Sequence, residues 1–371
     1  MGIRRQVFVT VGTTKFDSLI NVVDTIEFQN MLSSLGYNQL IIQIGNYSGT
    51  IKNSIETQDT DDFRDSARGS EFRSCYYRYK ASLSSDMDTS DLIITHGGSG
   101  TILETLEKDK SCVCVINETL MHNHQTELAD KLAQLQYIIS TVPEKLIDTL
   151  ESKFSEYDMN RKHLDNKVSL NALREFSSSL SDQFPKDKPN KSMVVLGSGG
   201  HTAEMFYLLS KVDKKQFSPF IYVMANSDQR SEDKIHIAHN SSATGTNDFS
   251  VCKIPRSRNV GQSYIHSIWT TLVALFYCLS LLYKERPDVI ICNGPGTCIP
   301  ICFSALVLKW FRIKKCKIVY IESLARVQNL SLSGKIMQHF SDWFVVQWFE
   351  LLGKVNCKNI SVLNIFFDLV N

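Results

Sequence analysis

Short, almost uninterrupted apolar runs alternate with helix-length amphipathic segments along the whole chain. In the first half, runs of strand length cover residues 7–12, 40–45, 91–96 and 112–117. Runs that are apolar at nearly every position are typical of parallel strands covered on both faces. Helical patterns begin at Thr101 and His122, so this half has a strand–helix–strand rhythm. Residues 49–74 show neither periodicity, and we expect a surface loop there.

The second half repeats the rhythm after a polar stretch. Its strand candidates begin at Met193, Phe220, Ser250, Asp288, Lys317 and Trp343. The polar stretch is rich in Ser, Lys, Asp and Pro, and Pro185 and Pro189 disfavour a continuous helix through it. We therefore predict an α/β fold of two Rossmann-like doubly wound domains that face a cleft, at residues 1–170 and 193–371, joined by a linker at 171–192.

Composition agrees with two globular domains and argues against a protein that coats nucleic acid. The 371 residues are 43% hydrophobic and 21% charged, which is globular, and the length exceeds one ordinary domain. Lys and Arg number 40 against 39 Asp and Glu, so the net charge is only +1. The ten cysteines lie scattered in apolar segments without paired CxxC motifs. This pattern indicates buried, reduced thiols of a cytosolic compartment and disfavours zinc sites or disulfides.

Two glycine-rich turns each follow a strand candidate and precede a helix. The first contains Gly97, Gly98, Ser99 and Gly100, and the second contains Gly199, Gly200 and His201. Glycines let the backbone turn tightly, and the free amides at a helix start attract phosphate oxygens. Neither turn carries the lysine of a P-loop, which disfavours ATP hydrolysis. One such turn could be only a close helix–strand contact, but two on separate domains indicate a diphosphate ligand.

Polar residues near these turns are candidates for sugar contacts and for proton transfer. Glu104 could accept hydrogen bonds from both ribose hydroxyls, or it could be an ordinary solvent-facing helix residue. Asn123, His124 and Gln125 suit sugar hydroxyls, or they cap the helix that they begin. The HxH pattern lacks a third ligand nearby, so we expect no bound metal. His201 could take a proton or contact phosphate at the exit of its turn, whereas an isolated histidine there would only cap the helix.

The sequence around these turns resembles a known glycosyltransferase. The stretch "THGGSGTILETLEKDKSCVCVINETLMHNHQTELADKL" resembles the donor-binding subunit of the two-component eukaryotic enzyme that adds the second N-acetylglucosamine (GlcNAc) to dolichyl-diphosphate-GlcNAc. The stretches "VLGSGGHTAEM", "VIICNGPGTCIP" and "IVYIESLARVQNLSLSGKIMQHFSDWFVVQW" resemble its membrane-bound partner subunit. Both subunits are similar to the bacterial transferase MurG of the GT-B superfamily. The chain thus resembles both subunits fused, with the donor domain first.

The resemblance implies an inverting transfer of GlcNAc from UDP-GlcNAc to the 4-hydroxyl of lipid-linked GlcNAc, without a cofactor, at the cytosolic face of the endoplasmic reticulum. It assigns donor binding to Gly12, Thr13, Thr14, Gly97, Gly98, Ser99, Gly100, Glu104, Asn123, His124 and Gln125. It assigns acceptor binding to Gly199, Gly200, Gly294, Pro295, Gly296 and Asn329. His201 is the first candidate base and Glu322 the second, and stabilising the acceptor diphosphate is the alternative role for His201.

Residues 265–283 carry no formal charge and are long enough to span a bilayer. Spanning would separate the strands near Ser250 and Asp288, which should share one sheet. We therefore expect a helix that lies in the membrane interface, with flanking Arg256, Arg258, Lys284 and Arg286 near anionic headgroups. A second apolar helix at residues 299–315 ends in basic residues. A helix buried in a soluble domain is the alternative.

Two other functions fit parts of the sequence. A UDP-sugar epimerase with the same two-domain architecture would explain the donor turn but not the apolar interfacial segments. A non-catalytic scaffold that binds a sugar nucleotide, for other enzymes of lipid-linked oligosaccharide assembly, would keep Glu104 and Gln125 but would not need His201.

Overall fold

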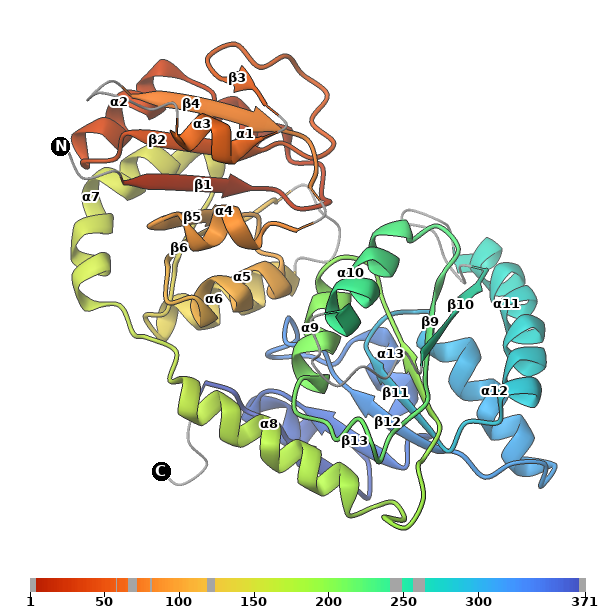
Figure 1. Cartoon of the computed structure of the whole chain (residues 1–371). Coiled ribbons are helices and arrows are strands. Elements are labelled where there is room, and N and C mark those ends of the chain that lie inside the picture. The colour runs from red at the N-terminus through yellow and green to blue at the C-terminus, as the bar shows by residue number, and fades with distance from the viewer. Residues whose placement is uncertain are drawn as a thin grey trace. The chain divides into compact units, whose positions relative to one another are not determined.

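The computed structural model describes residues 5–57, 59–65, 72–80, 82–118, 124–240, 249–255 and 264–366. The chain divides into two compact units, Met1–Leu164 and Asp165–Asn371. Each unit is built on one seven-stranded parallel sheet with helices packed against it (Figure 1). The predicted α/β fold of two doubly wound domains is therefore confirmed.

The first unit has the strand order β3-β4-β2-β1-β5-β6-β7. Its strands are β1 (Gln6–Thr10), β2 (Gln39–Gln43), β3 (Ile55–Glu56), β4 (Arg73–Tyr77), β5 (Leu92–Thr95), β6 (Ser111–Val115) and β7 (Ile139–Thr141). Its helices are α1 (Asp17–Val23), α2 (Ile26–Ser34), α3 (Thr60–Asp65), α4 (Ser84–Asp88), α5 (Ser99–Glu107), α6 (His124–Gln134), η1 (Pro143–Lys145) and α7 (Leu146–Asn160). Val7 and Val9 enter one core cluster and Phe8 enters another, so β1 is buried on both faces. This is why its sequence is apolar at nearly every position.

The second unit has the strand order β10-β9-β8-β11-β12-β13-β14. Its strands are β8 (Ser192–Val195), β9 (Phe220–Ala225), β10 (Phe249–Ile254), β11 (Val289–Asn293), β12 (Lys317–Ile321), β13 (Trp343–Val346) and β14 (Ile360–Val362). Its helices are α8 (Asn166–Ser181), α9 (Gly200–Leu209), α10 (Gln229–Asn240), α11 (Tyr264–Glu285), α12 (Cys298–Trp310), α13 (Leu332–Met337) and η2 (Phe349–Lys354). The ten cysteines are free and eight are buried, as the sequence predicts.

The segment 49–74 is more regular than the predicted surface loop. It contains β3 and α3 and the first residues of β4. The buried side chains of β4 include Cys75 and Tyr77, which pack in a small cluster with Phe8 and Ile41. The loop prediction was wrong here because β3 and α3, with two and six residues, are too short for either periodicity to be visible.

The helix α8 replaces the first part of the predicted linker at 171–192. The Ser169 hydroxyl donates to the backbone oxygen of Ile365 at 2.9 Å, and the Phe176 and Trp343 rings stack with centroids 5.4 Å apart. Leu173, Phe176 and Leu180 are buried in the second unit at helical spacing. The sequence did not indicate this helix because serines between these residues interrupt the apolar pattern. The helix ends at Ser181, ahead of the prolines that exclude its continuation.

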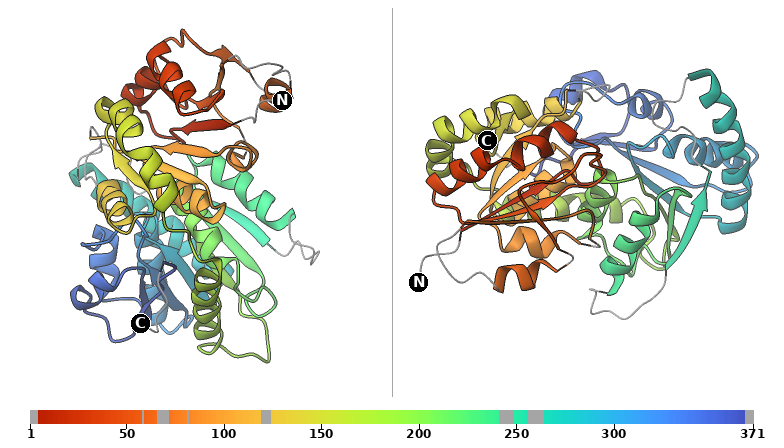
Figure 2. Two further views of the ribbon diagram at one scale, coloured as in Figure 1. Left: turned by 90° about the vertical axis from the view of Figure 1, so that its left-hand side faces the viewer. Right: turned by 90° about the horizontal axis from the view of Figure 1, so that it is seen from above.

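The helices α11 and α12 lie side by side against the second sheet (Figure 2). Ala274, Cys278 and Leu282 of α11 are buried at intervals of one helical turn. Of the helices in the described ranges, none has the length and apolar character that crossing a membrane requires. The predicted flanking residues Arg256 and Arg258 lie outside the described residues.

Candidate functional site

Each sheet has one point at which the strand order reverses. In the first unit it lies between β1 and β5, and in the second between β8 and β11. In open parallel sheets, ligands bind outside the carboxyl ends of the strands at this point. The predicted turns at Gly12 and Gly97 follow β1 and β5, and those at Gly199 and Gly294 follow β8 and β11. All four of these glycines have positive φ angles, which other residues adopt at a cost.

The His96 imidazole separates the two turns of the first unit. A Cβ atom on Gly12 would lie 2.7 Å from His96 Cε1, and one on Gly98 would lie 2.9 Å from His96 Nε2. His96 Nδ1 lies 3.4 Å from the Thr10 backbone oxygen. Burial lowers the pKa of His96 to about 4, so the ring is neutral at physiological pH. Sequence reasoning did not single out His96, although its place at a strand end before two glycines was a usable signal.

Hydrogen bonds of the Gln43 side chain fix the conformation of the turn after β1. The Gln43 amide donates to the backbone oxygens of Gly12 at 2.9 Å and Arg78 at 2.8 Å, and it accepts from the Thr10 hydroxyl at 2.7 Å. Thr13 is exposed and Thr14 half-buried on this turn. Because these buried hydrogen bonds leave the turn little freedom, its backbone is preorganised for a ligand.

The helix α5 starts directly at the second turn of this unit. Gly98 is its N-cap, and the buried Ser99 and Gly100 form its first turn. The first amides of such a helix have no partner within it and favour an anion. Glu104 lies half-buried in the next turn of α5.

The helix α6 brings one predicted sugar contact to the same turn. A Cβ atom on Gly97 would lie 3.5 Å from Gln125 Cβ and 3.6 Å from Gln125 Oε1. His124 is the first residue of α6, whereas Asn123 lies outside the described residues. The structure therefore gathers Gly12, Gly97, Gly98 and Gln125 at one edge of the first sheet.

The second unit gathers an imidazole and two turns in a similar way. Gly199, with φ +66°, is the N-cap of α9. A Cβ atom on Gly197 would lie 2.8 Å from His201 Cβ and 2.9 Å from Pro295 Cβ, and one on Gly294 would lie 3.3 Å from His201 Cε1. His201 thus packs against the turn that contains Gly294, Pro295 and Gly296. Asn329 is exposed in the loop between β12 and α13.

Two side chains that the sequence did not single out hold His201. The buried Asn293 amide donates to the His201 backbone oxygen at 3.1 Å, which joins α9 to β11. The buried Glu204 carboxylate lies with Oε2 4.0 Å from His201 Nδ1. The fold alone brings Asn293 to the histidine, whereas Glu204 is three positions after it on α9, a spacing that was a usable signal.

Glu322, the second candidate base, is completely buried. Its Oε1 accepts from the Ser323 amide at 3.0 Å, and its Oε2 accepts from the Ser331 amide at 3.0 Å and hydroxyl at 3.1 Å. A Cβ atom on Gly334 would overlap Oε2, so the carboxylate sits against the start of α13. Burial raises the pKa of Glu322. These contacts favour a structural role for Glu322, which links β12 to α13, over a role as a base that exchanges protons with a ligand.

The stability of the fold should depend on the charge of Glu204. Burial raises the pKa of this carboxyl from 4.5 to about 7. Between these values the folded protein binds the proton more tightly than the unfolded chain, so the group favours folding as the pH falls and opposes it as the pH rises. Relative to Glu204→Gln, the wild type should gain up to about 3 kcal/mol of unfolding free energy between about pH 8 and pH 5. Denaturant unfolding of both proteins measures this, and a difference that is constant with pH contradicts it.

The part of the chain that the structure describes contains no ready set of metal ligands. No group of three or more His, Cys, Asp or Glu side chains is arranged there to hold an ion.

Comparisons with known proteins also divide the chain into two parts, but their boundary follows α8, whereas the structural boundary precedes it. Residues 6–183 match the glycosyltransferase family 28 C-terminal domain, and residues 192–363 match the family described as oligosaccharide biosynthesis protein Alg14 like. The UDP-N-acetylglucosamine transferase subunit ALG14 of Rattus norvegicus is 48% identical over 167 residues, which cover 44% of this chain and 77% of that protein. The Homo sapiens subunit ALG14 is 45% identical over 167 residues, which again cover 44% of this chain and 77% of that protein.

A solved structure resembles part of the chain. The NMR solution structure of ALG13 is 26% identical, and the match covers 42% of this chain and 87% of that one. Its TM-score of 0.31 is too low to establish a shared fold. The assignment therefore depends on the two family matches and on the ALG14 relatives, of which the chain covers more than two thirds. The chain belongs to the Alg14 family of oligosaccharide biosynthesis proteins, and it carries a glycosyltransferase family 28 C-terminal domain ahead of its Alg14-like half.

Proposed function

We propose that this chain is a UDP-GlcNAc-dependent N-acetylglucosaminyltransferase of lipid-linked oligosaccharide synthesis, with donor and acceptor sites on one polypeptide. The observation that carries the proposal is the pair of glycine turns at the switch point of each sheet, one pair in each family-matched half. The reaction is an inverting transfer of GlcNAc to the 4-hydroxyl of GlcNAc-diphosphate-dolichol, the second step of lipid-linked oligosaccharide assembly. The enzyme works at the cytosolic face of the endoplasmic reticulum.

The first unit binds the donor. The start of α5 and the turns at Gly12 and Gly97–Gly100 face the diphosphate of UDP-GlcNAc, with Thr13 and Thr14 beside it. Glu104 accepts hydrogen bonds from the ribose hydroxyls, and Asn123, His124 and Gln125 contact the sugar. Fixed amides at a helix start stabilise the negative charge that develops on the departing UDP. The neutral His96 ring supports this site by holding the two turns apart.

The second unit binds the acceptor and activates it. Gly199, Gly200 and the turn at Gly294–Gly296 face the acceptor diphosphate, and Asn329 lines the approach. His201 takes the proton of the acceptor 4-hydroxyl as its oxygen attacks C1 of GlcNAc, and the bond from C1 to the UDP oxygen breaks. The electron pair of that bond leaves with UDP, and the configuration at C1 inverts. A base at this position contributes roughly 10²- to 10⁴-fold to such a step.

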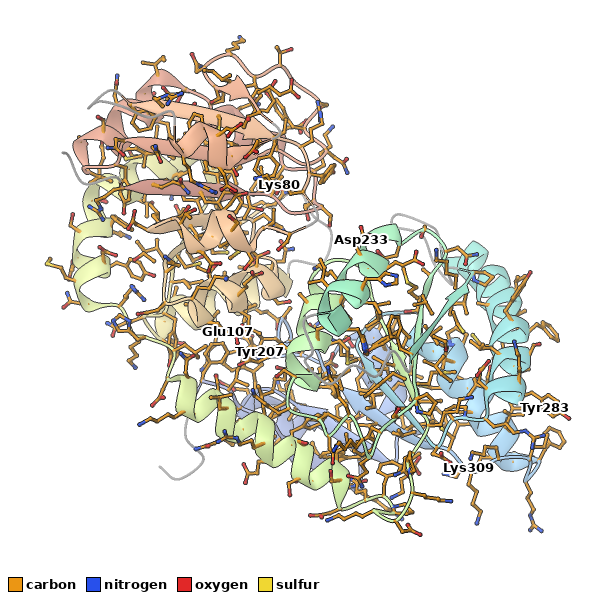
Figure 3. The ribbon with its side chains drawn as sticks, viewed as in Figure 1. Lys80, Glu107, Tyr207, Asp233, Tyr283 and Lys309 are labelled. Atoms are coloured by element: carbon orange, nitrogen blue, oxygen red, sulfur yellow. The ribbon has the colours of Figure 1, made fainter. Side chains whose placement is uncertain are left out.

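An exposed apolar face supports contact with the lipid surface that holds the acceptor. On α11, Phe276 is 73% exposed, and at the end of α12, Trp310 is 85% exposed. Tyr283 of α11 and Lys309 of α12 both lie on this outer side of the unit (Figure 3). The exposed basic side chains at the ends of the two helices are Lys284, Arg286, Lys309, Arg312 and Lys315. Large exposed apolar side chains beside cations suit an anionic membrane interface.

We expect the double variant Phe276→Ser/Trp310→Ser to bind anionic vesicles at least about tenfold more weakly than the wild type. Each lost aromatic removes roughly 1.5–3 kcal/mol of apolar burial, and 1.4 kcal/mol is a factor of about ten. Vesicle co-sedimentation measures the binding. Met159→Ser, which removes a residue 78% exposed in the first unit, is the matched control and should bind as the wild type does. Equal binding by all three proteins would contradict the assignment of this face.

The test of the proposed function is transfer of labelled GlcNAc from UDP-GlcNAc to a short-chain polyprenyl-diphosphate-GlcNAc by the purified chain. Disaccharide product supports the proposal. Conversion of UDP-GlcNAc to another UDP-sugar without the lipid acceptor would favour an epimerase. Saturable binding of UDP-GlcNAc without turnover, by a folded protein, would favour a scaffold and overturn the transferase.

A further inference from the structure

The buried carboxylate of Glu204 stands next to the imidazole of His201 on the same helix. The two residues are three positions apart on α9, so their side chains lie on one face. Glu204 Oε2 lies 4.0 Å from His201 Nδ1, which is within ion-pair distance. The carboxylate is 1% exposed, so bulk water does little to screen it.

Three donors from other elements fix the Glu204 carboxylate. The Leu324 amide donates to Oε1 at 2.6 Å, the Gln347 amide also donates to Oε1, and the Ser323 hydroxyl donates to Oε2 at 3.2 Å. Ser323 and Leu324 follow β12, and Gln347 follows β13. Hydrogen bonds of this kind stabilise the ionised carboxylate, while burial raises its pKa to about 7. With this pKa the carboxyl is ionised above about pH 7, where its negative charge acts on a neighbouring cation.

We propose that Glu204 is a positioning residue of the transfer reaction, which orients the His201 imidazole and stabilises its protonated form. This inference depends on the proposed function, in which His201 is the base. Nδ1 is the ring nitrogen near Glu204, and in the proposed step Nε2 receives the proton of the acceptor hydroxyl. The proton stays on His201, and the carboxylate stabilises the imidazolium that results. Glu204 itself neither gains nor loses a proton in the step.

The other elements packed around His201 add one more acid. Asn293, Gly294 and Pro295 from the turn after β11 are uncharged. From the end of β12, Glu322 Oε1 would lie 3.8 Å from a Cβ atom on Gly294. Burial raises the pKa of that carboxyl, and the hydrogen bonds to it and the charge of Arg326 offset only part of this rise. Backbone and hydroxyl donors hold both Glu322 oxygens, whereas Glu204 Oε2 is the carboxylate oxygen within ion-pair distance of the imidazole.

The test is the pH profile of kcat for Glu204→Gln, which keeps the shape of the side chain and removes its charge. We expect kcat to fall about 10- to 100-fold, with KM for UDP-GlcNAc unchanged within about twofold. In the wild type, Glu204 is ionised above about pH 7 and there keeps the proton on the imidazolium. Without this negative neighbour, the imidazolium releases its proton more easily. The acid limb of the profile should therefore move about one pH unit lower. Glu285→Gln, which alters the carboxylate paired with Lys191 at the opposite edge of the sheet, should change neither value.

A second variant separates charge from shape. Glu204→Asp keeps the charge, so the acid limb should stay in place and kcat should lie between those of the wild type and Glu204→Gln. If both variants lose activity to the same extent and the acid limb of the pH profile moves in neither, then Glu204 has only a structural role and the inference is overturned. Wild-type kcat in Glu204→Gln would overturn it as well. If His201→Ala remains active, the proposed base fails, and that result is distinct from either outcome for Glu204.

Discussion

Replacing His201 with alanine should lower kcat for GlcNAc transfer by about 10²- to 10⁴-fold. The imidazole packs against the turn at Gly294 and is the base that takes the acceptor proton in the proposed reaction. Alanine retains the helical conformation of α9 and removes only the ring, so the donor site in the other unit keeps its structure. KM for UDP-GlcNAc should therefore stay within about twofold of the wild type, because the loss falls on the chemical step.

The control for this variant is His339→Ala, which removes an imidazole outside the site from the same unit. Its kcat should match that of the wild type. A His201→Ala protein with intact kcat but a much higher KM for the lipid acceptor would show that the ring binds diphosphate. That result would contradict its role as the base.

Replacing Gly12 with alanine should raise KM for UDP-GlcNAc by at least about tenfold and lower the stability of the first unit. Gly12 has φ +55°, where a side chain costs roughly 1–2 kcal/mol. The new methyl group would also lie 2.7 Å from His96 Cε1, so the ring or the turn must move. The Gln43 side chain donates a hydrogen bond to the Gly12 backbone oxygen and so restricts how the turn can move. We therefore expect the added methyl group to shift the backbone amides that face the donor diphosphate. Steady-state kinetics and thermal unfolding measure the two effects.

Gly36→Ala provides a matched control for strain alone. Gly36 has φ +83°, but the nearest atom to an added Cβ is Arg5 Nη1 at 3.8 Å, which is ordinary contact. This variant should lose a similar strain energy and keep its KM. If Gly12→Ala and Gly36→Ala lose the same stability and both keep KM, the packing of His96 between the turns has no part in donor binding.

The central strands of both sheets could be predicted because both of their faces are buried. In such strands nearly every position is apolar, so the sequence signal does not depend on knowing which face is inside. The strand β7 is only three residues long, and β3 only two, and runs this short carry no periodicity. The strand β14 lies at a sheet edge with half-buried side chains. Its weak apolar pattern gave no reason to place it in the sheet.

The candidate site was predictable only where its parts are local in sequence. The turns at Gly97 and Gly199 each combine a strand end, glycines and a helix start within a few residues, and the pattern is visible without a fold. Asn293 is different, because the part that it plays at His201 is defined by a contact that the sheet topology creates, whereas Glu204 is only three positions from His201 on α9. Asn293 lies 92 positions from its partner in the sequence. No single-sequence pattern encodes such a pair.

The chain passes between the two units only once, at Leu164 and Asp165. Each side of that point contains a complete sheet with its own pair of glycine turns. Two separate polypeptides would have to meet by diffusion, and an excess of either would remain idle. One covalent crossing instead guarantees a one-to-one ratio of the halves during synthesis. It also keeps each half at an effective concentration on the order of millimolar around the other, however much of the protein the cell makes.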